Sequence, residues 1–119
     1  MTLVIQEDVP LAKRTTIGLG GNADQFIACK SVDDLRAGLA HAREQELPVH
    51  VLGGGSNTIF ADAGWRGVVL AVQLPGIEIG SDGVVVAGAG EAWDALVQRT
   101  IVAGLGGLEA MSGIPGLVG

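Results

Sequence analysis

The part of this 119-residue chain that could do chemistry is residues 51–60, VLGGGSNTIF, in which three glycines precede a serine and an asparagine. Glycine adopts positive φ angles and carries no Cβ, so consecutive main-chain N–H groups can converge on an anion. The Ser56 hydroxyl and the Asn57 carboxamide can donate further hydrogen bonds to phosphate oxygens. The pattern therefore predicts a phosphate site built from main-chain amides. A tight turn after a buried strand, with an Asx-type hydrogen bond from Ser56 or Asn57, explains it equally well.

Other phosphate-binding and catalytic patterns are weaker. No lysine follows Gly55, as a P-loop requires, and GLGGNA at 18–23 lacks the preceding strand and following helix of a dinucleotide fingerprint. We expect His41 to be solvated on a charged helix and His50 to be packed or at a sheet edge, and neither belongs to a recognisable catalytic set. Two histidines and a single cysteine argue against a zinc site. Redox chemistry would therefore require a cofactor.

Composition limits the class of partner and the compartment. The formal net charge of −6 and the isoelectric point of 4.6 argue against a nucleic-acid partner. Cys29 is the only cysteine, which excludes an intrachain disulfide and favours a buried structural thiol. The N-terminus lacks the basic region of a signal peptide, and no uncharged run approaches the ~18 apolar residues of a membrane span. These features predict a cytoplasmic protein with no membrane partner, and no obligate protein partner is evident.

The elements that must position the glycine-rich stretch form a strand–helix–strand unit. A β-prone segment at 23–30 precedes Ser31, a candidate helix N-cap with Asp34 three residues later. Apolar residues at helical spacing predict a helix over 32–46, and a strand follows at 49–52. The connection is expected to be right-handed and the two strands parallel. The glycines then lie directly after the carboxyl end of the second strand.

Further elements follow the glycine-rich stretch, and with them the fold class is α/β (α+β) with a mixed sheet, in one domain spanning 1–119. They are a turn, a strand buried on both faces, a hairpin and a helix that ends at Gly104. The turn is expected at 61–67, the buried strand at 68–72 and the two strands of the hairpin at 77–79 and 84–88. The helix is expected from its apolar face, which runs from Trp93 to Ile101.

Three blocks of sequence, taken together and in order, resemble the UDP-N-acetylenolpyruvoylglucosamine reductase family. They are RTTIGLGGNADQF at 14–26, LPVHVLGGGSNTIFAD at 47–62 and MSGIPGLVG at 111–119. The resemblance implies the N-terminal FAD-binding part of that enzyme, with the fold of the vanillyl-alcohol-oxidase-type (PCMH) flavoproteins and without the C-terminal substrate domain. The apolar, glycine-rich end of the chain favours truncation over the alternative of a docked C-terminal strand. In the family, NADPH reduces FAD, which reduces a UDP-sugar, UDP-N-acetylglucosamine enolpyruvate, to UDP-N-acetylmuramate for peptidoglycan.

By position, the resemblance assigns residues 53–57, the glycine loop, to the FAD pyrophosphate. It assigns residues of the C-terminal tail, 112–119, to the flavin, with the exception of Leu117. The assigned loop residues are Gly53, Gly54, Gly55, Ser56 and Asn57, and the assigned tail residues are Ser112, Gly113, Ile114, Pro115, Gly116, Val118 and Gly119. Because the loop contains no histidine, FAD is expected to be noncovalent.

The resemblance assigns no catalytic residue. In the family a serine, an arginine and a glutamate assist the reaction from positions beyond the SGIPG motif, so this chain alone is expected to be inactive. Thr15 also departs from the family, where an asparagine is common, and this leaves the role of Thr16 open. Two alternatives remain: another FAD oxidoreductase of the same superfamily, or a non-catalytic module in which the glycine loop is only a turn.

Overall fold

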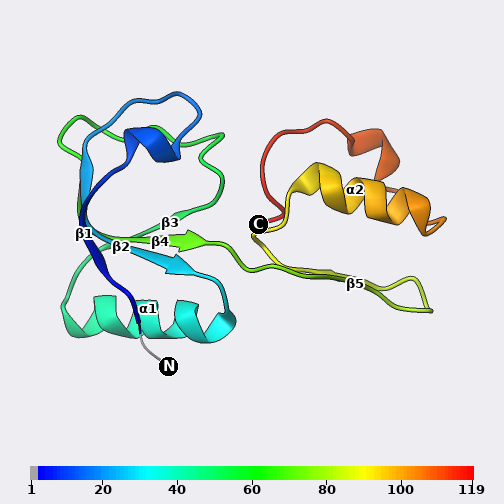
Figure 1. Cartoon of the computed structure of the whole chain (residues 1–119), viewed down its shortest axis with the longest axis horizontal. Coiled ribbons are helices and arrows are strands. Elements are labelled where there is room, and N and C mark those ends of the chain that lie inside the picture. The colour runs from blue at the N-terminus through cyan, green and yellow to red at the C-terminus, as the bar shows by residue number, and fades with distance from the viewer. Residues whose placement is uncertain (1–2) are drawn as a thin grey trace.

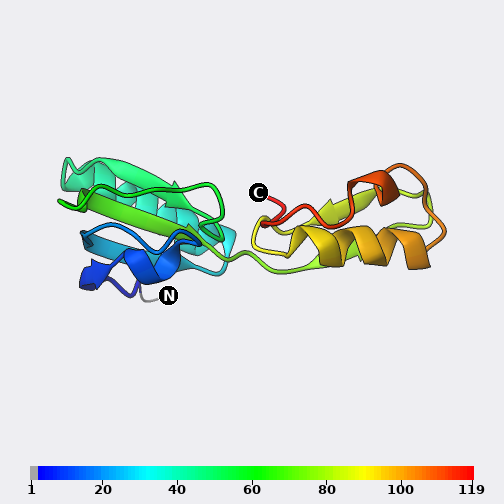
Figure 2. The ribbon, with the colours of Figure 1, turned by 90° about the horizontal axis from the view of Figure 1, so that it is seen from above.

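The computed structural model describes residues 3–119, which form two lobes joined by extended segments (Figures 1 and 2). The molecule measures 46 × 33 × 17 Å, and its Cα radius of gyration is 16.3 Å. A single compact domain of this length would have a radius of gyration of about 13 to 14 Å. The excess follows from the two-lobed shape, in which each lobe carries its own sheet.

The first lobe is built on a four-stranded mixed sheet with the order β1-β2-β4-β3. Strands β2, β4 and β3 are parallel, and β1 is antiparallel to β2. Their bounds are Gln6–Pro10 for β1, Asn22–Cys29 for β2, Val49–Leu52 for β3 and Trp65–Val72 for β4. The mixed sheet and the predicted strand–helix–strand unit are confirmed.

The two faces of this sheet bury separate apolar clusters. Helix α1 (Val32–Glu44) covers one face, where Ile27, Val68 and Leu70 are buried. On the opposite face, Phe26 packs with apolar residues from the loops above the sheet. Because β4 lies between β2 and β3, its side chains are buried on both faces, as the lack of alternation in 68–72 predicted.

Helix α1 begins at the predicted N-cap. The Ser31 Oγ accepts a hydrogen bond from the Asp34 N–H at 3.1 Å, and the Asp34 carboxylate accepts one from the Lys30 N–H at 3.0 Å. The first of these bonds satisfies a backbone donor at the start of the helix that has no partner within it. The helix ends at Glu44, two residues before the expected bound.

Replacing Ser31 by alanine should lower the free energy of unfolding by about 1 kcal/mol, because the Asp34 N–H loses its acceptor. Urea denaturation followed by circular dichroism measures the change. Ser81→Ala is the matched control: Ser81 is an exposed residue of the hairpin turn whose hydroxyl makes no hydrogen bond within residues 3–119. Equal midpoints for the two variants would contradict the capping role.

One expectation for the first lobe was wrong in its bounds, and two features of the lobe were not predicted. Strand β1 was not predicted, because only Val9 of its five residues is buried and Asp8 has a φ of 53° that interrupts any alternation. The predicted turn at 61–67 is shorter, since the Gly64 N–H donates to the Ala61 carbonyl at 2.9 Å and β4 already begins at Trp65. The strands β2 and β3 are parallel but not neighbours, because β4 lies between them.

The second lobe consists of the predicted hairpin and helix. Strands β5 (Ile77–Ile79) and β6 (Val85–Ala87) are antiparallel, and the Gly83 N–H closes their turn by donating to the Gly80 carbonyl at 3.0 Å. Helix α2 (Trp93–Val102) lies over one side of the hairpin in Figure 1. A 3-10 turn, η2 (Glu109–Met111), then leads into the C-terminal tail. Within residues 3–119, no helix has the length and apolar character needed to cross a bilayer.

Candidate functional site

The glycine loop lies where the parallel strands of the first lobe end. Because β2, β3 and β4 run in the same direction, their carboxyl ends lie at one edge of the sheet. The glycine loop follows β3 at that edge and Gln73 follows β4, with the Gln73 N–H donating to the Cys29 carbonyl at 2.8 Å. Ligands of open α/β sheets bind at the carboxyl ends of the strands, so the loop occupies a favoured position.

The C-terminal tail approaches the same edge from the second lobe. It runs antiparallel to the segment that precedes α2, with a bridge between Leu117 and Ala92. The Gly116 carbonyl accepts from the Trp93 N–H at 3.0 Å, and the Val118 N–H donates to the Glu91 carbonyl at 2.8 Å. The tail is therefore docked in an extended conformation on the segment that precedes α2.

Loop and tail together line a pocket of about 320 Å³, which we name the loop–tail pocket. All five glycine-loop residues take part, together with four of the assigned tail residues and two residues, Thr58 and Leu117, that sequence reasoning missed. Its lining residues are Gly53, Gly54, Gly55, Ser56, Asn57, Thr58, Pro115, Gly116, Leu117, Val118 and Gly119. Segments almost sixty residues apart in the sequence thus meet across the two lobes.

The amides of the glycine loop are not used by the protein itself. Within residues 3–119, none of the backbone N–H groups of 53–57 donates to a main-chain or side-chain acceptor. The Ser56 hydroxyl and the Asn57 carboxamide likewise make no hydrogen bond there, so the Asx-type turn that would explain the loop without a ligand does not form. Backbone donors left in this state require water or a ligand as a partner. The loop can therefore offer them to an anion.

The structure explains Gly55 differently from Gly53 and Gly54. Gly55 has a φ of +77°, and a Cβ there would overlap the Arg14 carbonyl oxygen and come within 2.8 Å of the Thr15 Cα. Gly55 is thus required by the chain's own packing. A Cβ at Gly53 or Gly54 would meet only the Leu117 side chain, at 3.9 and 3.4 Å. The expectation that all three glycines clear space for a ligand is therefore too broad.

Three assigned tail residues, Ser112, Gly113 and Ile114, lie outside the loop–tail pocket. The Gly113 N–H donates to the Asp94 Oδ1 at 2.8 Å, and the Ile114 side chain is half exposed. Just before them, the exposed Glu109 carboxylate accepts hydrogen bonds from its own N–H and that of Gly107, which lower its pKa. This part of the tail is held by the second lobe and does not reach the glycine loop.

A second pocket, of about 330 Å³, adjoins the loop–tail pocket and shares Gly53 and Gly54 with it. We name it the Arg14 pocket. Its floor is formed by apolar residues of the three parallel strands and its rim by polar residues that sequence reasoning did not assign to a site. The floor residues are Phe26, Leu52 and Ala71, and the rim residues are Lys13, Arg14, Thr15, Thr16 and Gln73. These rim residues could have been found from the sequence, because the RTT triplet at 14–16 begins the first of the three blocks that carry the family resemblance.

Neither histidine lines either pocket. The expectation for His41 was wrong: its ring is half-buried, with its Nε2 atom 2.7 Å from the Gln25 Oε1. The expectation for His50 is confirmed, since its ring packs on Phe60 at a centroid distance of 5.0 Å, in the edge strand β3. Its Nε2 atom is buried without a partner among residues 3–119. His50 is therefore a packing residue of the sheet face below the loops.

The one cysteine has the predicted structural role. Cys29 is fully buried, and burial together with the nearby Asp34 carboxylate raises the pKa of its thiol. The protein thus holds this thiol neutral and away from solvent. Within residues 3–119, no three His, Cys, Asp or Glu side chains gather in a way that could hold a metal ion.

Comparison with known proteins defines the class. The family described as FAD binding domain matches residues 23–119, and the chain belongs to this family. The match extends across both lobes and includes the glycine loop and the whole tail. The α+β FAD-binding fold expected from the sequence is therefore confirmed.

More specific similarity is to reductases. The chain is 45% identical over 115 residues to the UDP-N-acetylenolpyruvoylglucosamine reductase of Nocardia farcinica, covering 97% of this chain and 30% of that protein. It is 43% identical to the reductase of Thermobifida fusca, covering 100% and 35%. The crystal structure of the Thermus caldophilus reductase matches 100% of this chain and 40% of that one with a TM-score of 0.67 and 32% identity. The chain thus spans about a third of the length of these relatives.

Proposed function

We propose that this chain is the FAD-binding part of a UDP-N-acetylenolpyruvoylglucosamine reductase. The family match and the names of the similar proteins support this assignment. The observation that carries it is the set of amides without an internal acceptor in residues 53–57, which line a pocket completed by the tail. An acidic protein can bind a pyrophosphate in this way, because oriented amides attract an anion without positive side chains.

The residues present fit FAD. The amides of the glycine loop, with the Ser56 hydroxyl and the Asn57 carboxamide, would hold the pyrophosphate. Backbone groups of the docked tail, at Pro115, Gly116, Val118 and Gly119, would line the flavin. The assignment of Ser112, Gly113 and Ile114 to the flavin stays a prediction, because these residues do not line the loop–tail pocket. His50 packs against Phe60, His41 contacts Gln25, and neither lines the two pockets, which supports noncovalent binding of the flavin.

When bound, FAD would supply hydride transfer, with NADPH as the reductant and UDP-N-acetylglucosamine enolpyruvate as the substrate. This chemistry would place the protein in peptidoglycan synthesis in the cytoplasm. The part played by residues 3–119 is to bind and orient the cofactor, since no catalytic residue is assigned to them.

The experiment is a titration of the 119-residue chain with FAD and with riboflavin, followed by quenching of flavin fluorescence. Because riboflavin lacks the pyrophosphate, we expect it to bind at least about tenfold more weakly than FAD. Gly54→Asp, which places a carboxylate beside the free amides, should weaken FAD binding by a similar factor. Gly106→Asp is the control, because a Cβ at Gly106 meets only the Glu109 carboxylate, at 4.0 Å, in the second lobe.

Two results would count against the proposal. One is a wild-type chain that binds FAD no more tightly than riboflavin, since the amides would then contribute nothing. The other is equal FAD affinity of Gly54→Asp and Gly106→Asp, since the bound anion would then lie elsewhere.

A further inference from the structure

We propose that Arg14 is a preformed phosphate-binding residue, whose guanidinium neutralises an anion held by the free amides of the glycine loop. The inference deepens the proposed function and rests on it for the identity of that anion, the pyrophosphate of FAD. It adds a cationic side chain to a site that the sequence had described as made of backbone amides alone.

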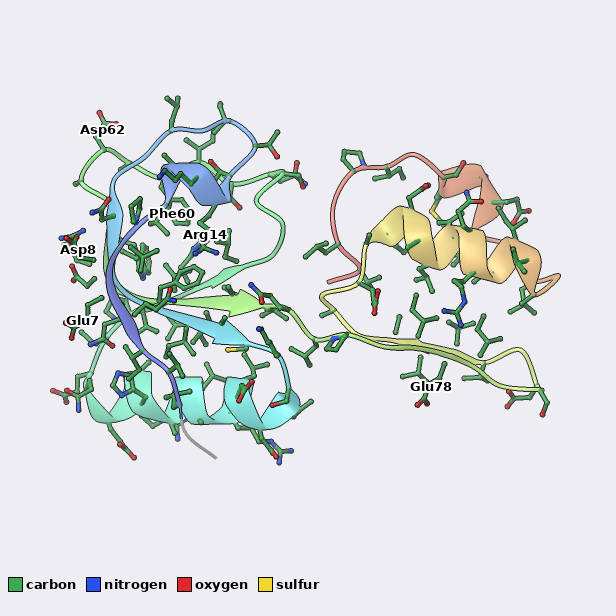
Figure 3. The ribbon with its side chains drawn as sticks, in the orientation of Figure 1. Glu7, Asp8, Arg14, Phe60, Asp62 and Glu78 are labelled. Atoms are coloured by element: carbon green, nitrogen blue, oxygen red, sulfur yellow. The ribbon has the colours of Figure 1, made fainter. Side chains whose placement is uncertain are left out.

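The first observation is that the guanidinium of Arg14, an exposed residue, lies over an aromatic ring. Its Cζ lies 4.5 Å from the centroid of the Phe26 ring, and Phe26 is 2% exposed in the floor of the Arg14 pocket. A guanidinium over an aromatic face is held by a cation–π interaction while its N–H donors remain available at the edge. Figure 3 shows the Arg14 side chain beneath η1 (Ala12–Arg14), on the side of the sheet opposite α1.

The second observation is that Arg14 has no acidic partner. The chain has 13 acidic and 7 basic residues, so an arginine would readily find a carboxylate. Within residues 3–119 the ion pair joins Arg66 to Asp24 at 2.9 Å, and Arg14 takes part in none. No Asp or Glu lines the Arg14 pocket, whereas Lys13 does. The pocket therefore has positive charge without a counter-ion, in a chain with a net charge of −6.

The third observation is that the backbone of residues 14–16 is in direct contact with the glycine loop. The Thr16 N–H donates to the Gly55 carbonyl at 3.0 Å, and the Arg14 backbone lies where a Cβ of Gly55 would be. Gly53 and Gly54 line the Arg14 pocket as well as the loop–tail pocket. A phosphate on the loop amides would thus lie next to the Arg14 pocket, and a guanidinium can donate charge-assisted hydrogen bonds to phosphate oxygens.

The test compares Arg14→Gln and Arg14→Lys with the wild-type chain, using FAD, riboflavin and inorganic pyrophosphate as separate probes. Binding of the flavins is measured by fluorescence quenching, and binding of pyrophosphate by the shift of the thermal unfolding midpoint. Arg36→Gln is the matched control, because Arg36 is exposed on α1 at the opposite face of the sheet and its loss changes the net charge equally.

We expect Arg14→Gln to weaken FAD binding about tenfold or more and to remove most of the stabilisation by pyrophosphate. Riboflavin binding should not change, since riboflavin carries no phosphate. Arg14→Lys should lie between wild type and Arg14→Gln, because it keeps the charge and loses the planar fork. The FAD affinity of the wild type should also fall more steeply with added salt than that of Arg14→Gln.

The outcomes separate this inference from the proposed function. If Arg14→Gln binds FAD and pyrophosphate as the wild type does, the inference is wrong while FAD binding stands. If pyrophosphate binds in an Arg14-dependent way but FAD binds no more tightly than riboflavin, the inference stands and the proposed cofactor is wrong. If pyrophosphate does not stabilise the wild type at all, Arg14 is not an anion-binding residue. Should Arg14→Gln fail to fold, Arg14→Lys gives the same decision, because the inference requires it to bind FAD and pyrophosphate more weakly than the wild type does.

Discussion

The Gly55→Ala variant should lose about 2 to 5 kcal/mol of its free energy of unfolding and should no longer bind FAD. Gly55 has a φ of +77°, a conformation that costs an alanine about 1 to 2 kcal/mol. The added methyl group would also overlap the Arg14 carbonyl oxygen, and relieving such an overlap costs about 1 to 3 kcal/mol more. The relief would separate the glycine loop from residues 14–16 and disturb both pockets.

Gly18→Ala is the matched control for this variant. Gly18 has almost the same φ, +74°, but a Cβ added there would have no atom within 4 Å of it. It should therefore show only the conformational cost, about 1 to 2 kcal/mol, and retain FAD binding. Urea denaturation and FAD titration of both variants measure the two effects. Equal losses of stability in the two variants would show that the overlap with Arg14 does not govern the loop.

The Gly88→Ala variant should lower FAD affinity at least about tenfold while the first lobe stays folded. Two extended segments, 73–76 and 88–91, run side by side between the lobes, with the Gly88 N–H donating to the Gly76 carbonyl at 2.7 Å. The Glu91 carboxylate also accepts from the Gly76 N–H, at 2.6 Å. A Cβ at Gly88 would overlap the Leu74 carbonyl oxygen and would come within 2.7 Å of the Pro75 carbonyl carbon.

The physical reason for the expected loss is that this connection positions the tail. The tail docks on the residues that follow Gly88, with the Gly119 N–H donating to the Ala89 carbonyl at 3.0 Å. Forcing the two segments apart would move the tail away from the glycine loop and open the loop–tail pocket. Fluorescence titration measures the affinity, and circular dichroism during urea denaturation reports the sheet of the first lobe.

Gly106→Ala is the control for Gly88→Ala, because neither glycine has a positive φ and a Cβ at Gly106 has space. It should bind FAD as the wild type does. Wild-type affinity in Gly88→Ala would mean that the lobes tolerate a displaced connection, and that the tail does not depend on it for its position.

The local features of this fold were predictable because neighbouring residues specify them. Ser31 and Asp34 define the start of α1 through hydrogen bonds that span three residues. The turn from Gly80 to Gly83 depends equally on adjacent residues. Strand β1 was missed because it follows no local pattern: its pairing with β2, and not burial of its side chains, holds it in the sheet.

His41 shows why side-chain environments were less predictable. Its position on a charged helix indicated solvation, but Gln25 of β2 reaches its ring across the helix–sheet interface. The partner is sixteen residues away in the sequence, and no periodicity in α1 refers to it. The environment of Arg14 was equally unpredictable, because the ring under its guanidinium is that of Phe26, in strand β2 later in the chain.

The sequence by itself determined the glycine loop and its chemistry, because the backbone freedom of glycine and the donors of Ser56 and Asn57 are properties of the residues. The tertiary structure decided that the loop amides stay free of internal acceptors, and that the tail lines the same pocket as the loop. It also decided that Gly55 serves the packing against Arg14. These outcomes depend on the path of the chain between distant segments, which local patterns do not specify.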